Sequence, residues 1–313
     1  MRATDFLFLP LLLTSLVGCV ESPEAEPRNL SVASGPLTPT RYLTIDGLQI
    51  AVYEGPGNKG PGVLLLHGNT SSANAFARIL KASALTKRRV VAIDLPGYGN
   101  SDDAEYDIAT FTSVIAQAAV ELGVDDGVMV GWSLGGDFLL QTAHLLPDVR
   151  GYFLFGTAPV GGGPPISPFL GPDESYAGAA TQYGFVADLS EAQIDEYVHA
   201  FFRPGWWNIP QFFFDDGYRT DPGTRQAVLE AASGLDPDFL AEVPVAQALT
   251  VPIALVHAED DAFVRLDYLK AIAPSIPNLW QDKIIVVPSS GHALQWERPI
   301  TFGILLEAFL ADL

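Results

Sequence analysis

The chain has 313 residues, 48% of them hydrophobic, and is long enough to bury the core of one large α/β domain. It carries 37 acidic against 17 basic residues, and such a surface repels the phosphates of nucleic acids, so no nucleic-acid partner is expected. The five histidines are widely scattered, and the single cysteine, Cys19, cannot form an internal disulfide. The sequence therefore predicts no metal site and no other cofactor.

Residues 1–18 have the layout of a signal peptide. Arg2 precedes an apolar stretch over 6–17, which is too short to span a bilayer and is interrupted by Pro10. The stretch ends in Leu-Val-Gly-Cys, which resembles the lipobox of bacterial lipoproteins. That resemblance implies a mature chain that begins at lipidated Cys19 and is anchored to a membrane of the bacterial cell envelope, with the outer membrane favoured. An ordinary cleaved signal peptide is the alternative.

Residues 19–40 are expected to form a flexible tether, because they carry four prolines and show no apolar periodicity. The pattern changes at Arg41. Two β-rich runs there flank Asp46 and Gly47, which predicts a β-hairpin. The folded domain is therefore expected over 41–313.

Short, nearly continuous apolar runs follow the hairpin, which is typical of strands that are buried on both faces of a sheet. Helix-length segments separate the early runs. Alternating strands and helices predict an α/β fold with a mostly parallel central sheet and helices on both faces. The runs lie at 63–66, 90–93, 128–130, 152–155, 253–256 and 284–287.

A long interval separates the run ending at Phe155 from the next, and we expect a helical cap insertion over about 160–248. Ser190 and Gln193 are spaced as a capping box, which predicts that a helix begins there. The stretch 201–214 holds five phenylalanines and two tryptophans in fourteen residues. It is either the core of the insertion itself or the inner wall of a lid that binds an apolar ligand.

The stretch "VGWSLGG" over 130–136 follows a predicted strand and precedes a predicted helix. Ser133 stands there in a G-x-S-x-G pattern, whose glycines allow a tight strand-to-helix turn. A serine hydroxyl attacks a carbonyl only when a base takes its proton, and that base needs a carboxylate to orient it. His292 follows the last predicted strand, and Asp261 and Asp260 follow the one before it.

This order of motifs resembles the α/β-hydrolase fold over residues 41–313. The resemblance implies that Ser133 is the nucleophile, His292 the base and Asp261 the acid, with Asp260 as the alternative acid. An oxyanion hole needs two N–H donors. Leu134 supplies one by its position after the nucleophile, and Asn69 in the "HGN" turn is expected to supply the other.

The chain resembles more closely the serine-dependent N-acyl homoserine lactonases of this fold. The stretches "HGNTSSANAF", "DLPGYGNSD", "GTAPV", "FVRLDY" and "NLWQDK" carry that resemblance. It implies that Tyr197 contacts a lactone, and we expect Asn69 and Trp132 to bind substrate too. The substrate is then a small acyl lactone or ester. A carboxylesterase and a non-catalytic ligand-binding surface lipoprotein are the alternatives, whereas dehalogenases and epoxide hydrolases of this fold have an aspartate where Ser133 stands.

Overall fold

The computed structural model describes residues 35–81 and 87–313. The predicted signal peptide over 1–18 and the predicted lipid-carrying Cys19 lie outside the described residues, as does most of the tether over 19–40. Within the described ranges, no helix combines the length and the apolar character that are needed to cross a membrane.

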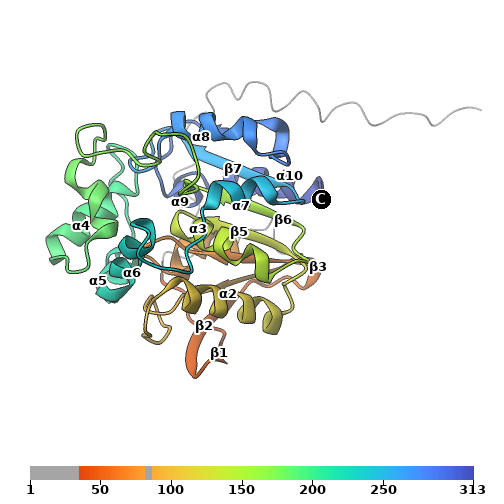
Figure 1. The fold of residues 1–313 in the computed structure, drawn as a ribbon. Coiled ribbons are helices and arrows are strands. Elements are labelled where there is room, and N and C mark those ends of the chain that lie inside the picture. Colours follow the sequence, from red (N-terminus) through yellow and green to blue (C-terminus); the bar gives the residue numbers. More distant parts are fainter. Residues whose placement is uncertain (1–34, 82–86) are drawn as a thin grey trace, which may run out of the picture. The chain divides into compact units, whose positions relative to one another are not determined.

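A mostly parallel sheet forms the centre of the described domain (Figure 1). Its strands lie in the order β1-β2-β4-β3-β5-β6-β7-β8. β2 runs antiparallel to β1 and to β4, and the other neighbouring strands are parallel. The predicted fold class is confirmed. The strands are β1 (Arg41–Ile45), β2 (Leu48–Glu54), β3 (Lys59–Leu66), β4 (Arg88–Ile93), β5 (Val128–Trp132), β6 (Gly151–Phe155), β7 (Ile253–Ala258) and β8 (Ile285–Val287).

The β1–β2 hairpin turns at Asp46 and Gly47, as the sequence predicts. Both residues have left-handed φ angles, 50° and 88°, which is the requirement of a type I′ turn. Ile45 pairs with Leu48 across the turn. The hairpin thus adds the antiparallel edge to an otherwise parallel sheet.

Two groups of helices pack beside the sheet. In one, α3 contacts α2 and α7, and in the other α1, α9 and α10 contact one another. Figure 1 shows α4, α5 and α6 together beyond one end of the sheet. The helices are α1 (Ala77–Leu80), α2 (Ile108–Leu122), α3 (Leu134–Thr142), α4 (Glu191–Ala200), α5 (Gln211–Arg219), α6 (Pro222–Ala232), α7 (Glu242–Ala248), α8 (Leu266–Ile272), α9 (Leu294–Glu297) and α10 (Pro299–Ala311), with short 3₁₀ turns η1 (Ala73–Phe76), η3 (Ala143–Leu145), η4 (Gly178–Phe185), η5 (Ala273–Ser275) and η6 (Trp280–Asp282).

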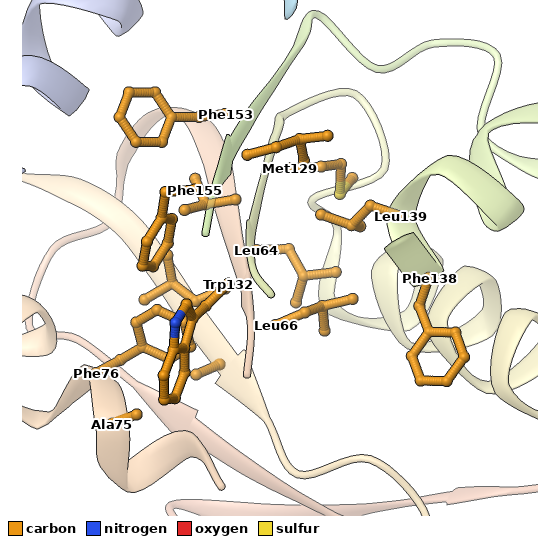
Figure 2. Packing of buried hydrophobic residues seen from close by; sticks show 14 of the residues in the cluster. Leu64, Leu66, Ala75, Phe76, Met129, Trp132, Phe138, Leu139, Phe153 and Phe155 are labelled. Atoms are coloured by element: carbon orange, nitrogen blue, oxygen red, sulfur yellow. The ribbon is translucent and has the colours of Figure 1, made fainter. Parts of the chain in front are cut away.

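The core forms on both faces of the central strands. Figure 2 shows Met129 of β5 beside Leu139 of α3, while Phe153 and Phe155 of β6 lie on the opposite side of the sheet. There the Phe153 ring meets the ring of Phe309 on α10, with centroids 5.7 Å apart. Strands covered on both faces are apolar throughout, which explains the continuous apolar runs of the sequence.

The interval between β6 and β7 is mainly helical. The capping box predicted at Ser190 is confirmed at the start of α4, because the Gln193 N–H donates to Ser190 Oγ while the Ser190 N–H donates to Gln193 Oε1. The interval contains η4, α4, α5, α6 and α7, and α7 packs against α3. The boundaries of the cap insertion, 160–248, stay a prediction.

The aromatic stretch over 201–214 is packing, and its alternative interpretation as a ligand-binding wall is wrong. Phe212 and Phe213 are buried against the Trp296 ring, at centroid distances of 5.3 and 5.4 Å. Trp207 points to solvent with 83% of its surface exposed. None of these residues lines the cavity at Ser133. Composition alone could not distinguish the two roles.

Candidate active site

Ser133 occupies the turn between β5 and α3 in a strained conformation. Its φ and ψ are 52° and −127°, a region that non-glycine residues rarely adopt and that costs about 1–3 kcal/mol. The surroundings hold it there: the Ser133 N–H donates to the Phe155 carbonyl at 2.9 Å, and Thr157 Oγ1 donates to the Ser133 carbonyl at 2.9 Å. The strain presents the serine side chain to a cavity.

The neighbouring glycines permit this turn through close approach, as the sequence predicts. A Cβ on Gly131 would lie 2.4 Å from the Cα of Gly136, and a Cβ on Gly135 would lie 2.4 Å from the Leu66 carbonyl oxygen. A Cβ on Gly136 would lie 2.1 Å from Thr157 Oγ1. Any side chain at these positions would push α3 away from the strands.

His292 and Asp261 form a buried pair in the loops that follow β8 and β7. His292 Nδ1 lies 2.9 Å from Asp261 Oδ2, which fits a donated N–H, and the N–H groups of Phe263 and Val264 donate to Asp261 Oδ1. Burial opposes ionisation of Asp261, but the charge and hydrogen bond of His292 outweigh it and lower the pKa of the carboxyl below its usual value. The hydrogen bonds that Asp260 makes with described residues here involve its backbone: its N–H donates to the Ser290 carbonyl, and its carbonyl accepts from the Tyr176 hydroxyl.

Several contacts hold the His292 loop. The Trp132 indole N–H donates to the His292 carbonyl at 2.9 Å, and the Ala293 N–H donates to the Phe201 carbonyl at 2.7 Å. Buried Glu297 accepts from the Gly291 N–H at 3.3 Å. The loop is thereby attached to β5 and to the segment that follows α4.

The predicted role of Trp132 in substrate binding is wrong. The side chain is fully buried and does not line the cavity. Its place on β5 turns it to the face opposite α3, where its ring lies 5.6 Å from the His292 ring and 5.4 Å from the Phe201 ring. Trp132 therefore supports the histidine rather than a ligand.

Ser133 and His292 both border Trp132. A Cβ on Gly68 would meet the Ser133 Cβ at 3.1 Å beside the indole, and a Cβ on Gly156 would meet the His292 ring at 3.0 Å beside the same indole. In the described part of the chain, the Ser133 hydroxyl makes no hydrogen bond. Such bonds in unliganded enzymes commonly tighten only when a substrate is present.

Asn69 and Leu134 lie beside Ser133 along the same cavity. Leu134 is the first residue of α3, so its N–H has no partner within the helix. The Asn69 side chain is engaged elsewhere, because its amide donates to the Gly184 carbonyl at 2.8 Å and its oxygen accepts from the Tyr98 hydroxyl at 3.3 Å. The part of Asn69 that is left for a role beside Ser133 is therefore its backbone and not its side chain.

Tyr197 of α4 also lines the cavity. Its ring packs edge-on against Phe263 and Phe201, and a Cβ on Gly184 would lie 2.6 Å from the Tyr197 hydroxyl oxygen. Gly184 thus leaves room for the tyrosine, a role that no sequence pattern indicated. The rest of the wall is mostly apolar. It comes from α2, α3, η4, α6, the segments before η4 and after α6, and the loop after β7, and it includes Ile108, Phe111, Phe138, Phe169, Phe185, Ala227, Val228, Ala231, Phe239, Phe263 and Val264.

The other histidines lie outside this pair. His67 is buried in its turn, accepts the Leu95 N–H at 3.1 Å, and lies 2.8 Å from the Gly68 carbonyl oxygen through its other ring nitrogen. Burial lowers the pKa of His67, so it stays neutral as a structural residue. His144 and His199 are exposed on helical segments. His257 is buried within β7.

Comparison with known proteins defines the class. Residues 63–302 match the Alpha/beta hydrolase family, so the chain belongs to that family. Among solved structures, a variant of the N-acyl homoserine lactonase AidH in complex with N-hexanoyl homoserine lactone is similar, with 29% identity, a TM-score of 0.74, and coverage of 87% of this chain and 97% of that one. AidH in complex with N-butanoyl homoserine also has 29% identity, a TM-score of 0.75, and coverage of 87% and 96%.

Curated relatives match a smaller part. A pimeloyl-acyl-carrier-protein methyl ester esterase of Xanthomonas oryzae pv. oryzae is 36% identical over 100 residues, which are 32% of this chain and 38% of that protein. The chain thus spans under two fifths of the length of such relatives. A structure described as a putative aryl esterase from Burkholderia cenocepacia, at 20% identity and a TM-score of 0.69, shares the fold. The predicted likeness to N-acyl homoserine lactonases is confirmed.

Proposed function

We propose that this protein is a serine hydrolase that cleaves an ester or lactone bond, with an N-acyl homoserine lactone or a similar acyl lactone as substrate. One observation carries the proposal. Ser133 stands on a strained turn at an apolar cavity. A buried Asp261–His292 pair with a 2.9 Å contact is held beside Trp132, the residue that precedes Ser133. Strain at a serine costs stability, and it is expected where the side chain has a chemical role.

In the proposed reaction the Ser133 oxygen attacks the substrate carbonyl carbon while His292 Nε2 takes the hydroxyl proton. Asp261 holds the Nδ1–H and stabilises the imidazolium. The N–H groups of Leu134 and Asn69 bind the carbonyl oxygen as it becomes negative. His292 then protonates the departing alkoxide, which yields the acyl-serine. Water attacks that acyl group, His292 takes its proton, and Ser133 recovers it as the acid is released.

The lactone substrate is supported by the likeness to AidH over 87% of this chain and by the cavity. Apolar walls suit an acyl chain, and the Tyr197 hydroxyl is a polar group at the same cavity. Hydrolysis of a lactone gives a single product, a hydroxy acid, because the alcohol and the acid are parts of the same molecule.

A carboxylesterase that cleaves small or medium acyl esters is the second candidate. The partial match to methyl ester esterases favours it, and the same residues would have the same roles. A non-catalytic ligand-binding protein is the third candidate, but such a protein gains nothing from a strained serine at a cavity.

A fluorophosphonate probe tests the nucleophile. We expect the wild-type protein to be labelled and Ser133→Ala to remain unlabelled, with Ser167→Ala, outside the cavity, labelled like the wild type. An unlabelled wild type would favour the non-catalytic protein. Turnover of homoserine lactones with graded acyl chains, compared with p-nitrophenyl esters, then separates the two enzymes. Cleavage of esters with intact lactones would identify a carboxylesterase.

A further inference from the structure

The cavity follows one face of α3 away from Ser133. Asp137 and Gln141 line it together with Ser133, and these three positions are four residues apart. Residues at that spacing share a helix face, and each step advances about 6 Å along the axis. Asp137 therefore lies one helical turn from the serine, within reach of a chain whose carbonyl is at Ser133.

Asp137 is paired with another acid at this end of the cavity. Its carboxyl lies close enough to that of Glu242, the first residue of α7, for a hydrogen bond once one of the two carries a proton, and Glu242 is 1% exposed. Each oxygen of Glu242 also has a donor of its own, because Gln141 Nε2 donates to Oε1 at 2.9 Å and the Val160 N–H donates to Oε2 at 2.7 Å. Burial raises the pKa of both carboxyls, so the pair keeps a proton near neutral pH.

Asp137 has acceptor capacity that the described residues leave unused. Its Oδ1 is enclosed and accepts no hydrogen bond from an N–H, hydroxyl or amide donor of the described residues. The residue as a whole is only half-buried, and the remainder of its carboxyl group belongs to the cavity wall. The Gln141 amide cannot turn to it, since Gln141 also bonds the Leu240 backbone through both its oxygen and its nitrogen.

The charges around the cavity restrict what fits there. Among the described residues that line it, Asp107, Asp137 and Glu242 are acidic, and none is Lys, Arg or His. An anionic group would meet like charge between apolar walls, and an ammonium group would lose its hydration there. A neutral group that donates a hydrogen bond satisfies the free acceptor at the lowest cost in desolvation.

We propose that the Asp137 end of the cavity is a subsite for a hydroxyl group on the acyl chain, so that the preferred substrates are hydroxyacyl esters or lactones. The proposal rests on the proposed function, because it places the acyl carbonyl at Ser133. The hydroxyl donates to the Asp137 carboxyl while the chain lies along α3 against the small residues Ala227 and Ala231 of α6.

Turnover of four p-nitrophenyl esters by the wild-type protein tests this subsite: those of octanoic, 8-hydroxyoctanoic, 8-aminooctanoic and octanedioic acid. We expect kcat/KM for the hydroxy ester to exceed that for the plain ester by about fivefold, the effect of one good hydrogen bond. We expect the free carboxylate of the octanedioic ester to place it below both. A hydroxy ester that is no better than the plain ester, or worse than the amino ester, would overturn the proposal.

Two variants locate the effect. Asp137→Asn keeps a carbonyl acceptor and can still bond Glu242, so the hydroxy preference should remain, whereas Asp137→Leu should bring the ratio close to one. Asp148→Leu, at an exposed acid outside the cavity, should keep the wild-type ratio. A preference that survives in Asp137→Leu would overturn the assignment.

If no ester is cleaved, the proposed function has failed, and calorimetry still tests the subsite. Wild-type protein should then bind 8-hydroxyoctanamide about fivefold more tightly than octanamide. Equal binding of the two amides would overturn the subsite independently of catalysis.

Discussion

At the scale of single residues, the sequence indicates chemistry better than it indicates orientation. The G-x-S-x-G pattern correctly places Ser133 on a turn, and the left-handed φ of 52° falls on the serine while its flanking glycines serve close packing. Asp261 and Asp260 are adjacent in the sequence, and only the resemblance to α/β-hydrolases favours Asp261. They differ in the fold because the loop after β7 aims Asp261 at His292 and binds its other oxygen with two N–H groups. The pattern at Ser133 does not show that Trp132 points away from the cavity, because the alternation of side chains along a strand decides which face each one takes.

Replacing Trp132 by phenylalanine should slow the reaction without weakening substrate binding. The change removes the N–H that the His292 carbonyl accepts, and leaving that buried carbonyl unpaired costs about 1–3 kcal/mol. Since Trp132 does not line the cavity, we expect kcat on a p-nitrophenyl ester to fall about tenfold with KM nearly constant.

Trp280→Phe is the matched control for that change. Its indole N–H donates to Asp312 Oδ2 at 2.8 Å near the end of α10, so the variant loses a similar bond away from the site and should keep its kcat. A Trp132→Phe protein with a raised KM and an unchanged kcat would mean that Trp132 does bind substrate.

At the scale of elements, the predicted strands all occur, and most differ only in where they begin or end. Short apolar runs bounded by turn residues carry enough local information for this. The cavity wall was much harder to predict, because residues such as Phe169, Gly184 and Phe239 come from segments without periodicity. Their positions depend on how the segment between β6 and β7 packs on the sheet, which no local pattern encodes.

Asp216 links that segment to the loop after β3. From α5 its carboxylate accepts hydrogen bonds from Ser72 Oγ at 2.6 Å and Asn74 Nδ2 at 2.9 Å. Burial raises the pKa of Asp216 to about 7, although these two bonds act in the opposite direction. In the unfolded chain this carboxyl titrates near pH 4. The folded protein therefore binds the proton more tightly, and Asp216 stabilises it less as the pH rises from about 4 to about 7.

Asp216→Asn should remove this part of the pH dependence. The free energy of unfolding is measured in urea at pH 4.5 and at pH 8. We expect its decrease between these two pH values to be about 2–4 kcal/mol smaller in the variant than in the wild type. Asp215→Asn, at the exposed neighbouring acid, should keep the wild-type difference. Equal pH dependence in wild type and Asp216→Asn would mean that the buried carboxyl is already ionised at low pH.

At the scale of the whole molecule, the formal net charge of −20 bears on how the protein could associate with a membrane. Membrane surfaces that contain anionic lipids repel such a protein, so its surface charge gives no attraction. Membrane attachment would then depend on the N-terminal region, where the sequence predicts a lipidated cysteine. We propose that Cys19 anchors the protein, because two acyl chains are enough for stable membrane binding.

Cys19→Ser should therefore release the protein completely from cell membranes, while the wild type should stay in the membrane fraction after a high-salt wash and leave it only in detergent. Salt screens surface charge but does not extract acyl chains, so the wash separates a lipid anchor from an electrostatic attachment. Ser22→Ala, three residues further along, should behave as the wild type does. A Cys19→Ser protein that still sediments with membranes would mean that another part of the chain holds it there, since removing the thiol removes the only site for the lipid.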